Sequence, residues 1–238
     1  MPAITTQEKY HDANPVVRFL LNRFFGRIHD AVYEAAPVTV LDAGCGEGEL
    51  VRRGVLPAGL RVTSLDLRPE ALALFRAHSK DLSRNNLATA PFGHGSVTPL
   101  GPSRDQRERC PNWQCGVLAK PERNDLVCAS VQALPFADRS MDAVLCLEVL
   151  EHLERPQLAL AELARVARHR VILSVPHEPY FRLGNLVRGK HLSGWGNHPE
   201  HVQHWNPATF QSFLQPTFAE VRVVEAFPWI VASCAVPR

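Results

Sequence analysis

Three glycines and two acids lie close together near the start of the chain, in the segment DAGCGEG at residues 42–48. This segment continues the apolar run VTVLDA at 38–43. Glycines let a backbone approach a ligand closely, and a glycine-rich turn after the first strand of an α/β sheet is typical of a nucleotide-like cofactor site. Glycines also form ordinary tight turns, so this turn alone does not decide the function.

Three acids narrow the choice of cofactor. Asp66 ends the run RVTSLD at 61–66, about twenty residues after the turn, where an acid can accept hydrogen bonds from both ribose hydroxyls. Dinucleotide sites use G-x-G-x-x-G and offer a helix N-terminus to a diphosphate, whereas this turn is G-x-G-x-G and carries Asp42 and Glu47, which would repel phosphates. The turn therefore predicts a cofactor that carries an ammonium and a sulfonium, and argues against a nicotinamide dinucleotide.

The elements that would position these residues follow from an alternation of short β-branched runs with helical stretches. Strands are predicted at 38–43, 61–66, 125–129, 143–147 and 171–175, and helices from Pro69 through Phe75, over 156–168 and over 207–214. The last two runs, 220–226 and 229–235, are separated by only two residues, which implies an antiparallel pair. The alternation predicts the α/β class, with a parallel sheet covered by helices.

Three longer segments carry a family resemblance: VLDAGCGEG at 40–48, SLDLRPEAL at 64–72 and ALPFADRSMDAVLCLEVLEHLERPQLALAELARV at 133–166. Together they resemble the class I, Rossmann-like S-adenosylmethionine-dependent methyltransferases, in the methyltransferase type 11 subgroup. The resemblance implies a mostly parallel seven-stranded sheet with an antiparallel C-terminal strand pair and helices on both faces. It also implies S-adenosyl-L-methionine (SAM) as cofactor and S-adenosyl-L-homocysteine (SAH) as product.

The same resemblance assigns cofactor contacts along the cleft. It implies that the turn lines the methionine end of SAM, that Asp66 holds the ribose, that three residues lie beside the adenine, and that the end of the fourth strand closes the site. Relatives commonly carry an Asp where this chain has Ser130, so the adenine amino contact is weaker or comes from the backbone. The residues are Asp42, Gly44, Cys45 and Gly46 for the turn, Leu67, Ser130 and Val131 for the adenine, and Leu147 for the strand end.

The N-terminal residues 1–30 resemble the capping helices of this family, through the segment YHDANPVVRFLLNRFFGR at 10–27. In that interpretation Tyr10 and Arg18 reach the cofactor carboxylate. The alternative is an amphipathic helix that covers the sheet and leaves Arg18 in solvent.

Candidates for catalysis follow the fourth and fifth strands. Glu148, Glu151 and His152 are spaced i, i+3 and i+4, so they share one face if a helix begins there. His152 matches the family's E-H-L segment, where it is catalytic or structural. Residues 176–206 are expected to cover the substrate, and their G-N-x-P-x-H-x-x-H-W pattern, which includes His201 and His204, resembles a subgroup of small-molecule and lipid methyltransferases. Either histidine could act as a general base.

Two groups of residues could be metal ligands, but their spacing argues against it. His198, His201 and His204 are spaced by three, which distributes them unevenly around a helical turn, and structural histidines are commoner than ligands. Cys110 and Cys115 lie in an insertion at 83–124 that lacks a hydrophobic period, and their four-residue spacing is wider than the usual two. We therefore expect a mobile segment or a lid here, and no metal.

Composition limits which kinds of partner and cellular location this chain can have. The 238 residues carry a formal net charge of +2, so no strong field favours nucleic acid, and no apolar stretch is long enough to span a membrane. A single domain over 1–238, a cytoplasmic location and reduced cysteines, Cys45, Cys128 and Cys146 among them, are expected.

The predicted function is transfer of a methyl group from SAM to an O, N or C atom of a small molecule, as in natural-product, quinone or lipid biosynthesis. A noncatalytic subunit that binds the cofactor or a partner is the alternative. A nucleic-acid methyltransferase is less favoured because the fourth strand ends in Cys-Leu-Glu and not in N/D-P-P-Y/F. The acceptor, the atom methylated and the oligomeric state stay open.

Overall fold

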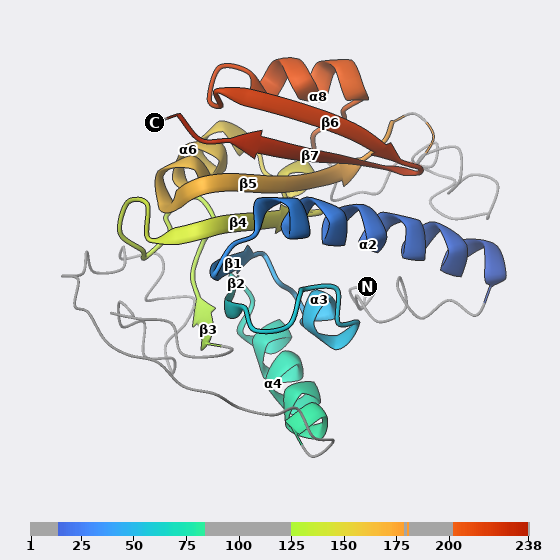
Figure 1. Ribbon diagram of the computed structural model, residues 1–238, viewed down its shortest axis with the longest axis vertical. Coiled ribbons are helices and arrows are strands. Elements are labelled where there is room, and N and C mark those ends of the chain that lie inside the picture. The colour runs from blue at the N-terminus through green and yellow to red at the C-terminus, as the bar shows by residue number, and fades with distance from the viewer. Residues whose placement is uncertain (1–13, 84–124, 179, 181–201, 238) are drawn as a thin grey trace.

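The computed structural model describes residues 14–83, 125–178, 180 and 202–237. Within them, one seven-stranded sheet has the strand order β3-β2-β1-β4-β5-β7-β6 (Figure 1). Only β7 runs antiparallel to its neighbours, β5 and β6. The strands are β1 (Thr39–Ala43), β2 (Arg61–Asp66), β3 (Asp125–Cys128), β4 (Met141–Leu147), β5 (Ala167–Pro176), β6 (Glu220–Ala226) and β7 (Trp229–Ala235). The predicted α/β class, the seven strands and the antiparallel C-terminal pair are confirmed.

Helices begin where the sequence supplies caps or proline. The long helix α2 (Pro15–Ala35) starts after Asn14, whose side chain accepts a hydrogen bond from the Val16 N–H, and it has proline in its first turn. Asn206 and Thr209 form a reciprocal capping box at the start of α8 (Pro207–Leu214). The remaining helices are α3 (Glu49–Arg52), α4 (Pro69–Ser83), the short 3₁₀ turn η1 (Leu150–His152) and α6 (Pro156–Val166).

Two hydrophobic cores hold these helices against opposite faces of the sheet, as expected for a parallel sheet that is buried on both sides. On one face α2 buries five apolar residues against alternate residues of β1, β4, β5 and β7. On the other face α6 and α8 cover the intervening residues of those strands. The α2 residues are Leu21, Phe24, Phe25, Ile28 and Val32.

The carboxyl ends of β4 and β5 lie at the same edge of the sheet, and the N-terminal end of α2 projects beyond that edge (Figure 1). In open α/β sheets ligands bind outside the carboxyl ends of the strands, next to the point where the strand order reverses. Here that point lies between β1 and β4, because the chain runs from β1 outward to β3 and then returns. The fold therefore places the glycine-rich turn and the end of β4 side by side.

Several predicted segments cannot be compared with the structure. The insertion at 83–124 and most of the loop at 176–206 lie outside the described residues, as does the first part of the N-terminal segment 1–30. The domain boundaries and the mobility of the insertion therefore stay predictions. One prediction is wrong: Cys128 is disulfide-bonded, with a partner outside the described residues, whereas Cys45, Cys146 and Cys234 are free. Cys128 is the last residue of β3 and is 3% exposed, so burial at a strand end does not by itself keep a cysteine reduced.

Candidate functional site

The turn after β1 is held against β2 by its own backbone. Both Gly44 and Cys45 donate their N–H groups to the Leu65 carbonyl, at 2.6 and 2.9 Å. Gly44, Gly46 and Gly48 all have positive φ, at 86°, 55° and 81°, a region that side chains strongly disfavour. The sequence therefore forms this turn because glycine stands at each of the three positions.

Packing explains two of these glycines. A Cβ on Gly44 would lie 2.3 Å from Cγ2 of Val149, and one on Gly48 would lie 2.6 Å from the Phe75 ring. At Gly46 the nearest atom to such a Cβ would be an Arg68 guanidinium nitrogen at 3.7 Å, an ordinary contact distance. A side chain at Gly46 would thus meet only the end of Arg68, while the other two glycines let Val149 and Phe75 of α4 pack closely.

Asp66 ties the turn to the end of β2. One carboxylate oxygen accepts the Gly46 N–H at 2.8 Å, and the other accepts the Arg68 N–H at 2.9 Å and its Nε at 3.3 Å. The Arg68 side chain is 60% exposed, whereas that of Asp66 is 8% exposed. A ligand that hydrogen-bonds to Asp66 would therefore meet an arginine that can move into solvent.

Asp42 lies at the bottom of the turn and is 2% exposed. Among the described residues, its Oδ2 has no hydrogen-bond partner. Burial and, secondarily, the Asp66 carboxylate raise the pKa of Asp42 from an ordinary 3.8 to about 7. The same two carboxylates and burial raise the pKa of the Cys45 thiol, so this thiol stays protonated and is no nucleophile. The turn is an acidic cradle, suited to a ligand with positive charge.

The loop that follows β3 forms the next part of the edge. The Ala129 N–H donates to the Asp66 carbonyl at 3.2 Å, and the Ser130 Oγ accepts the Gln132 N–H at 3.2 Å. Val131 is buried, whereas Leu67, which follows Asp66, is 38% exposed. Ser130 thus stabilises the turn of this loop, and its predicted place beside the adenine stays a prediction.

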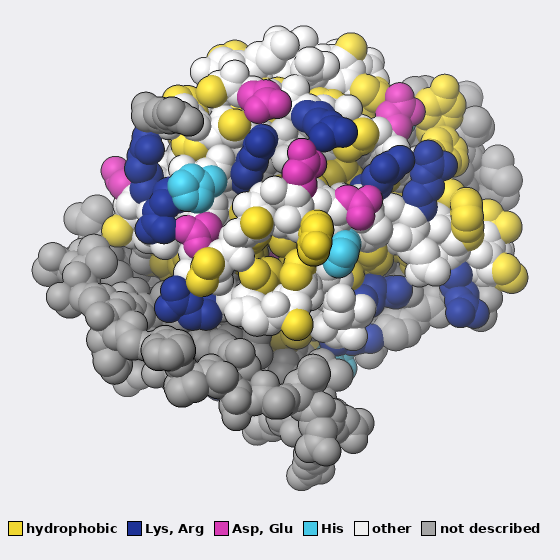
Figure 2. All heavy atoms as spheres, viewed as in Figure 1, with side chains coloured by type: hydrophobic (Ala, Val, Ile, Leu, Met, Phe, Trp, Pro, Cys, Tyr) yellow, Lys and Arg dark blue, Asp and Glu magenta, His cyan; other side chains and the backbone are white. Residues whose placement is uncertain are grey.

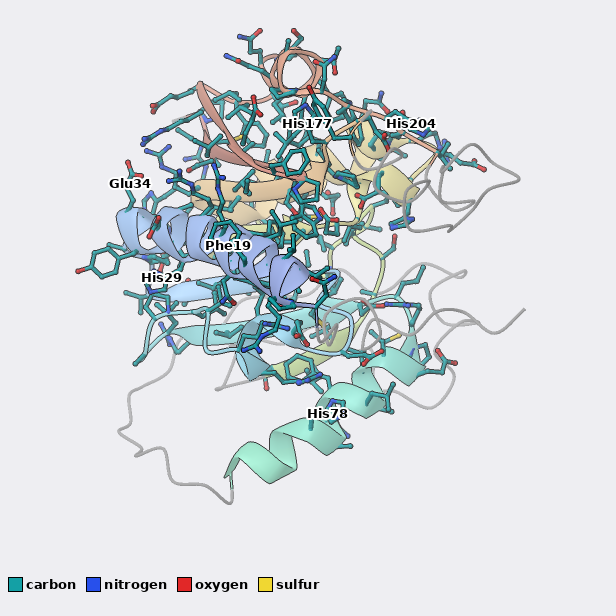
Figure 3. All side chains as sticks on the ribbon, turned by 90° about the vertical axis from the view of Figure 1, so that its right-hand side faces the viewer. Phe19, His29, Glu34, His78, His177 and His204 are labelled. Carbon is teal, nitrogen blue, oxygen red and sulfur yellow. The ribbon has the colours of Figure 1, made fainter. Side chains whose placement is uncertain are left out.

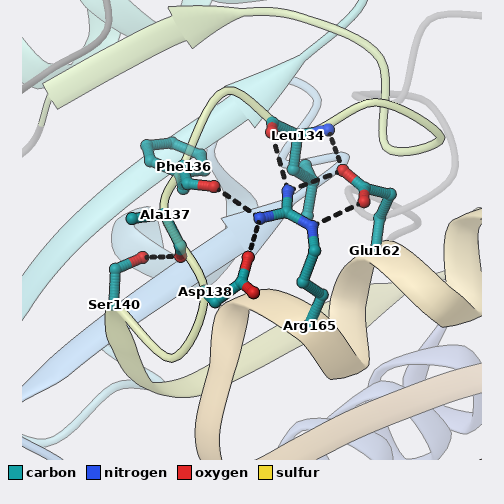
Figure 4. Close-up of polar contacts among 7 residues, drawn as sticks. All are labelled: Leu134, Phe136, Ala137, Asp138, Ser140, Glu162 and Arg165. Atoms are coloured by element: carbon teal, nitrogen blue, oxygen red, sulfur yellow. Dashed lines mark hydrogen bonds and ion pairs between the residues drawn. The ribbon is translucent and has the colours of Figure 1, made fainter. Parts of the chain in front are cut away.

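A half-buried arginine on α6, Arg165, holds this loop in place (Figure 4). The Arg165 guanidinium donates to the carbonyls of Leu134 and Phe136, at 3.0 and 2.8 Å, and to Asp138 at 2.8 Å. Glu162 binds Arg165 at 2.7 and 2.8 Å and also accepts the Leu134 N–H at 2.7 Å. Arg165 and Glu162 therefore give the loop a defined shape without lying at the edge themselves.

The end of β4 does not continue into a helix. Glu148 has a φ of 56°, and the 3₁₀ turn begins only at Leu150, so Glu148 does not share a helix face with Glu151 and His152. That predicted arrangement is wrong, because the left-handed residue turns the chain between strand and 3₁₀ turn. The His152 side chain is 35% exposed and lies 3.8 Å from Glu151, which is buried.

A family described as a methyltransferase domain matches residues 114–175, which include β3, β4 and most of β5. The methyltransferase domain of bacterial CtHen1-C superposes with a TM-score of 0.61 at 19% identity, over 92% of this chain and 100% of that chain. Residues 114–175 thus match a methyltransferase domain, and the chain as a whole has the class I methyltransferase fold. No curated protein sequence matches the chain.

Two further structures share the methyltransferase fold. Magnesium protoporphyrin IX methyltransferase (ChlM) from Synechocystis PCC 6803, solved with bound SAH, has a TM-score of 0.58 at 18% identity, over 97% of this chain and 92% of that chain. The YcgJ protein from Bacillus subtilis has a TM-score of 0.56 at 15% identity, over 86% and 71%. At these identities the likeness concerns the fold, and SAM is the methyl donor of the class.

The structure brings together most of the residues that the sequence predicts to bind the cofactor. They lie at the carboxyl edge, on the turn after β1, the end of β2, the loop after β3 and the end of β4: Asp42, Gly44, Cys45, Gly46, Asp66, Leu67, Ser130, Val131 and Leu147. Arg18 is exposed on α2, and Tyr10 lies outside the described residues. No contact of Arg18 with the turn is established.

The catalytic candidates are only partly described. His201 lies outside the described residues, and His204 is exposed next to the buried Trp205 (Figure 3). Residues 202 and 203 donate their N–H groups to the Glu151 carbonyl, at 2.8 and 3.0 Å. The end of the segment at 176–206 is therefore anchored beside η1, and its predicted role in covering the substrate stays a prediction.

Sequence reasoning missed two residues at this edge and the conformation of a third. Arg68 binds Asp66, and His177 is buried after β5 with its ring edge-on to Tyr180 at 4.9 Å. Glu148 was a candidate from the sequence, but its left-handed conformation after β4 was not predicted. In the described part of the chain no three His, Cys, Asp or Glu side chains gather as a metal site would require, and no helix is long and apolar enough to cross a membrane.

Proposed function

We propose that this methyltransferase domain transfers the methyl group of SAM to a small-molecule acceptor. The observation that carries the proposal is the acidic cradle: a buried Asp42 beneath a glycine turn whose Gly46 N–H is bound by Asp66. SAM carries an ammonium and a sulfonium, which a carboxylate-lined turn favours, and no phosphate, which such a turn would repel.

In this proposal each part of the edge meets one part of SAM. Asp42, Gly44, Cys45 and Gly46 line the methionine end, and Asp66 binds the ribose hydroxyls once Arg68 moves aside. Leu67, Ser130 and Val131 surround the adenine, and Leu147 closes the site from β4. Arg18, and Tyr10 before it, would reach the methionine carboxylate if the start of α2 folds over the edge.

The reaction is an in-line displacement at the methyl carbon, so it depends mainly on alignment of the acceptor with the sulfonium. An acceptor hydroxyl or amine also needs a group that takes its proton. His201, His204 and His152 are the candidate bases, because an imidazole accepts a proton near neutral pH. The anchoring of residues 202 and 203 on Glu151 supports a position of the histidine loop near the transferred methyl.

Charge distribution supports a small acceptor over a nucleic acid. The net charge is +2, and acidic and basic side chains are interspersed on the face shown in Figure 2. A protein that binds nucleic acid through phosphates typically concentrates Lys and Arg on one face. This surface is more consistent with a small molecule than with a nucleic acid. The small molecule would accept the methyl group on a hydroxyl, an amine or a carbon atom, as in natural-product, quinone or lipid biosynthesis.

We also propose a cytoplasmic location. The free thiols of Cys45, Cys146 and Cys234 support it, while the disulfide of Cys128 counts against it. The redox state of Cys128 in protein purified from the cytoplasm decides this point.

Methyl transfer is tested with SAM that carries a deuterated methyl group. The protein is incubated with a small-molecule extract in one sample and with bulk RNA and DNA in another, and mass spectrometry locates the label. Asp66→Ala, which lacks the proposed ribose ligand, is the negative control. Label in small molecules supports the proposal. Label in nucleic acid alone contradicts the acceptor class, and SAM binding without any transfer favours a noncatalytic subunit.

A further inference from the structure

Glu148 is held in an unusual backbone conformation at the end of β4. Its φ is 56°, in the left-handed region that non-glycine residues rarely adopt, and its N–H donates to the Ser174 carbonyl of β5 at 3.1 Å. Such conformations persist only where surrounding contacts enforce them, and they cluster at functional sites. The conformation sends the Glu148 side chain away from the direction that a continuing strand or helix would give it.

The carboxylate of Glu148 is oriented by two neutral donors from different strands. The Ser174 Oγ donates to Oε1 at 3.0 Å, and the Trp229 indole Nε1 donates to Oε2 at 2.8 Å. Trp229 is itself fixed, because it is 5% exposed and its ring packs against Phe24 of α2, with centroids 4.7 Å apart. Two rigid elements therefore determine where this acid points.

Glu148 also lies next to the cofactor cradle. The following residue, Val149, occupies the space above Gly44, and the preceding one, Leu147, pairs with Ser174 in the sheet. Glu148 therefore stands between the turn that would hold the methionine end of SAM and the end of β5. The transferred methyl belongs to that end of the cofactor, so an acceptor must come within reach of this part of the edge.

We propose that Glu148 is the acid that binds the proton-bearing group of the acceptor, and that the acceptors are therefore hydroxyl or amine compounds and not anions. The proposal rests on the proposed function. As the acceptor oxygen attacks the methyl carbon, the carbon–sulfur electron pair returns to sulfur and leaves a neutral thioether. The hydroxyl proton then passes to the Glu148 carboxylate, in place of the histidine bases named above, so that charge and atoms balance.

Apolar side chains at the same edge suggest that the rest of such an acceptor is apolar. Val16 and Phe19 are each 64% exposed on the end of α2 that projects past the sheet, and Figure 3 views the molecule from this side. Phenyl compounds of one shape and different charge are therefore suitable probes. Benzylamine, benzyl alcohol and benzoate supply a cation, a neutral hydroxyl and an anion.

The experiment measures the affinity of each probe for the SAH-saturated full chain by ligand-observed NMR, in parent, Glu148→Gln and Glu154→Gln proteins. Glu154 is an exposed acid six residues further on, so its variant removes the same charge without changing β4. The parent should bind benzylamine and benzyl alcohol more tightly than benzoate. Glu148→Gln should reduce the preference for benzylamine over benzoate about tenfold, and Glu154→Gln should leave it near the parent value.

A second variant, Ser174→Ala, keeps the charge but removes one orienting donor. It should weaken benzyl alcohol binding severalfold while SAH affinity stays at the parent value. The proposal is overturned if Glu148→Gln keeps the parent order, if Glu154→Gln changes it equally, or if none of the probes binds saturably. SAH affinity, measured by calorimetry on the same samples, separates the two proposals: absence of SAH binding refutes the proposed function, and the probe series repeated without SAH still tests Glu148.

Discussion

The buried acid beneath the glycine turn makes cofactor binding depend on pH in a defined direction. Burial and Asp66 raise the pKa of Asp42 to about 7, so in the cofactor-free protein this acid is mostly neutral below pH 7. The ammonium of SAM or SAH favours the ionised form. Binding must then release the proton from Asp42, and that release costs more free energy as the pH falls.

The size of the effect follows from the fraction of Asp42 that is ionised. About nine tenths are ionised one pH unit above 7 and about one tenth one unit below it, so the affinity for SAH should fall about tenfold from pH 8 to pH 6. Asp42→Asn removes the titrating group. In that variant the affinity should be lower at pH 8 and nearly independent of pH.

The assay is calorimetric titration of SAH at several pH values, in two buffers with different enthalpies of ionisation, which reports the protons released on binding. Glu47→Gln is a matched control, since it neutralises another buried acid of the same turn. An affinity in the parent that does not change between pH 6 and pH 8, or a pH dependence that survives in Asp42→Asn, would refute the assignment of Asp42 to the ammonium.

The raised pKa of Asp42 also makes the stability of the cofactor-free protein depend on pH. Because the pKa of Asp42 is higher in the folded chain than in the unfolded one, folding becomes less favourable as the pH rises from about 4 to about 7, by an amount on the order of 4 kcal/mol. Asp42→Asn should therefore exceed the parent in urea midpoint at pH 8, and by much less at pH 5. Equal urea midpoints of the variant and the parent at pH 8 would show that the ionised Asp42 carboxylate does not destabilise the folded chain.

Four further outcomes are expected. Asp66→Asn should weaken SAH binding by about 1.5 to 3 kcal/mol, measured by calorimetry on folded protein, and an unchanged affinity would exclude it as the ribose ligand. Arg68→Gln should tighten SAH binding severalfold, because it removes the side chain that occupies Asp66, and a weaker affinity would mean that the arginine binds cofactor. Gly44→Ala should lower the urea midpoint and Val149→Ala in the same chain should recover part of the loss, so the absence of recovery would show that the 2.3 Å contact is not its cause. Arg165→Met should destabilise the chain by about 1 to 3 kcal/mol, and a midpoint within error of the parent would show that its loop contacts contribute nothing.

The sheet could be predicted because its strands are short apolar runs bounded by glycine, proline or an acid. The runs at 61–66, 220–226 and 229–235 match β2, β6 and β7 residue for residue, and the two residues between β6 and β7 left no room for a parallel crossover. The turn after β1 could be recognised because glycine stands at each of its three positive-φ positions. In these places local sequence and tertiary structure require the same residues.

Other features of the site depend on contacts that are distant in sequence. The conformation of Glu148 requires Ser174 and Trp229, which lie 26 and 81 residues further along the chain, so a helical pattern at 148–152 was a misleading guide. The raised pKa of Asp42 likewise needs the burial that only the folded sheet provides.

The central claim is that the acidic glycine turn binds a methyl donor and not a dinucleotide. Calorimetric titration of the purified chain with SAM, and separately with NAD, tests it most directly. We expect saturable binding of one SAM for each chain, weakened in Asp66→Asn, and no heat from NAD beyond dilution. Saturable binding of NAD with no response to SAM or SAH would contradict it.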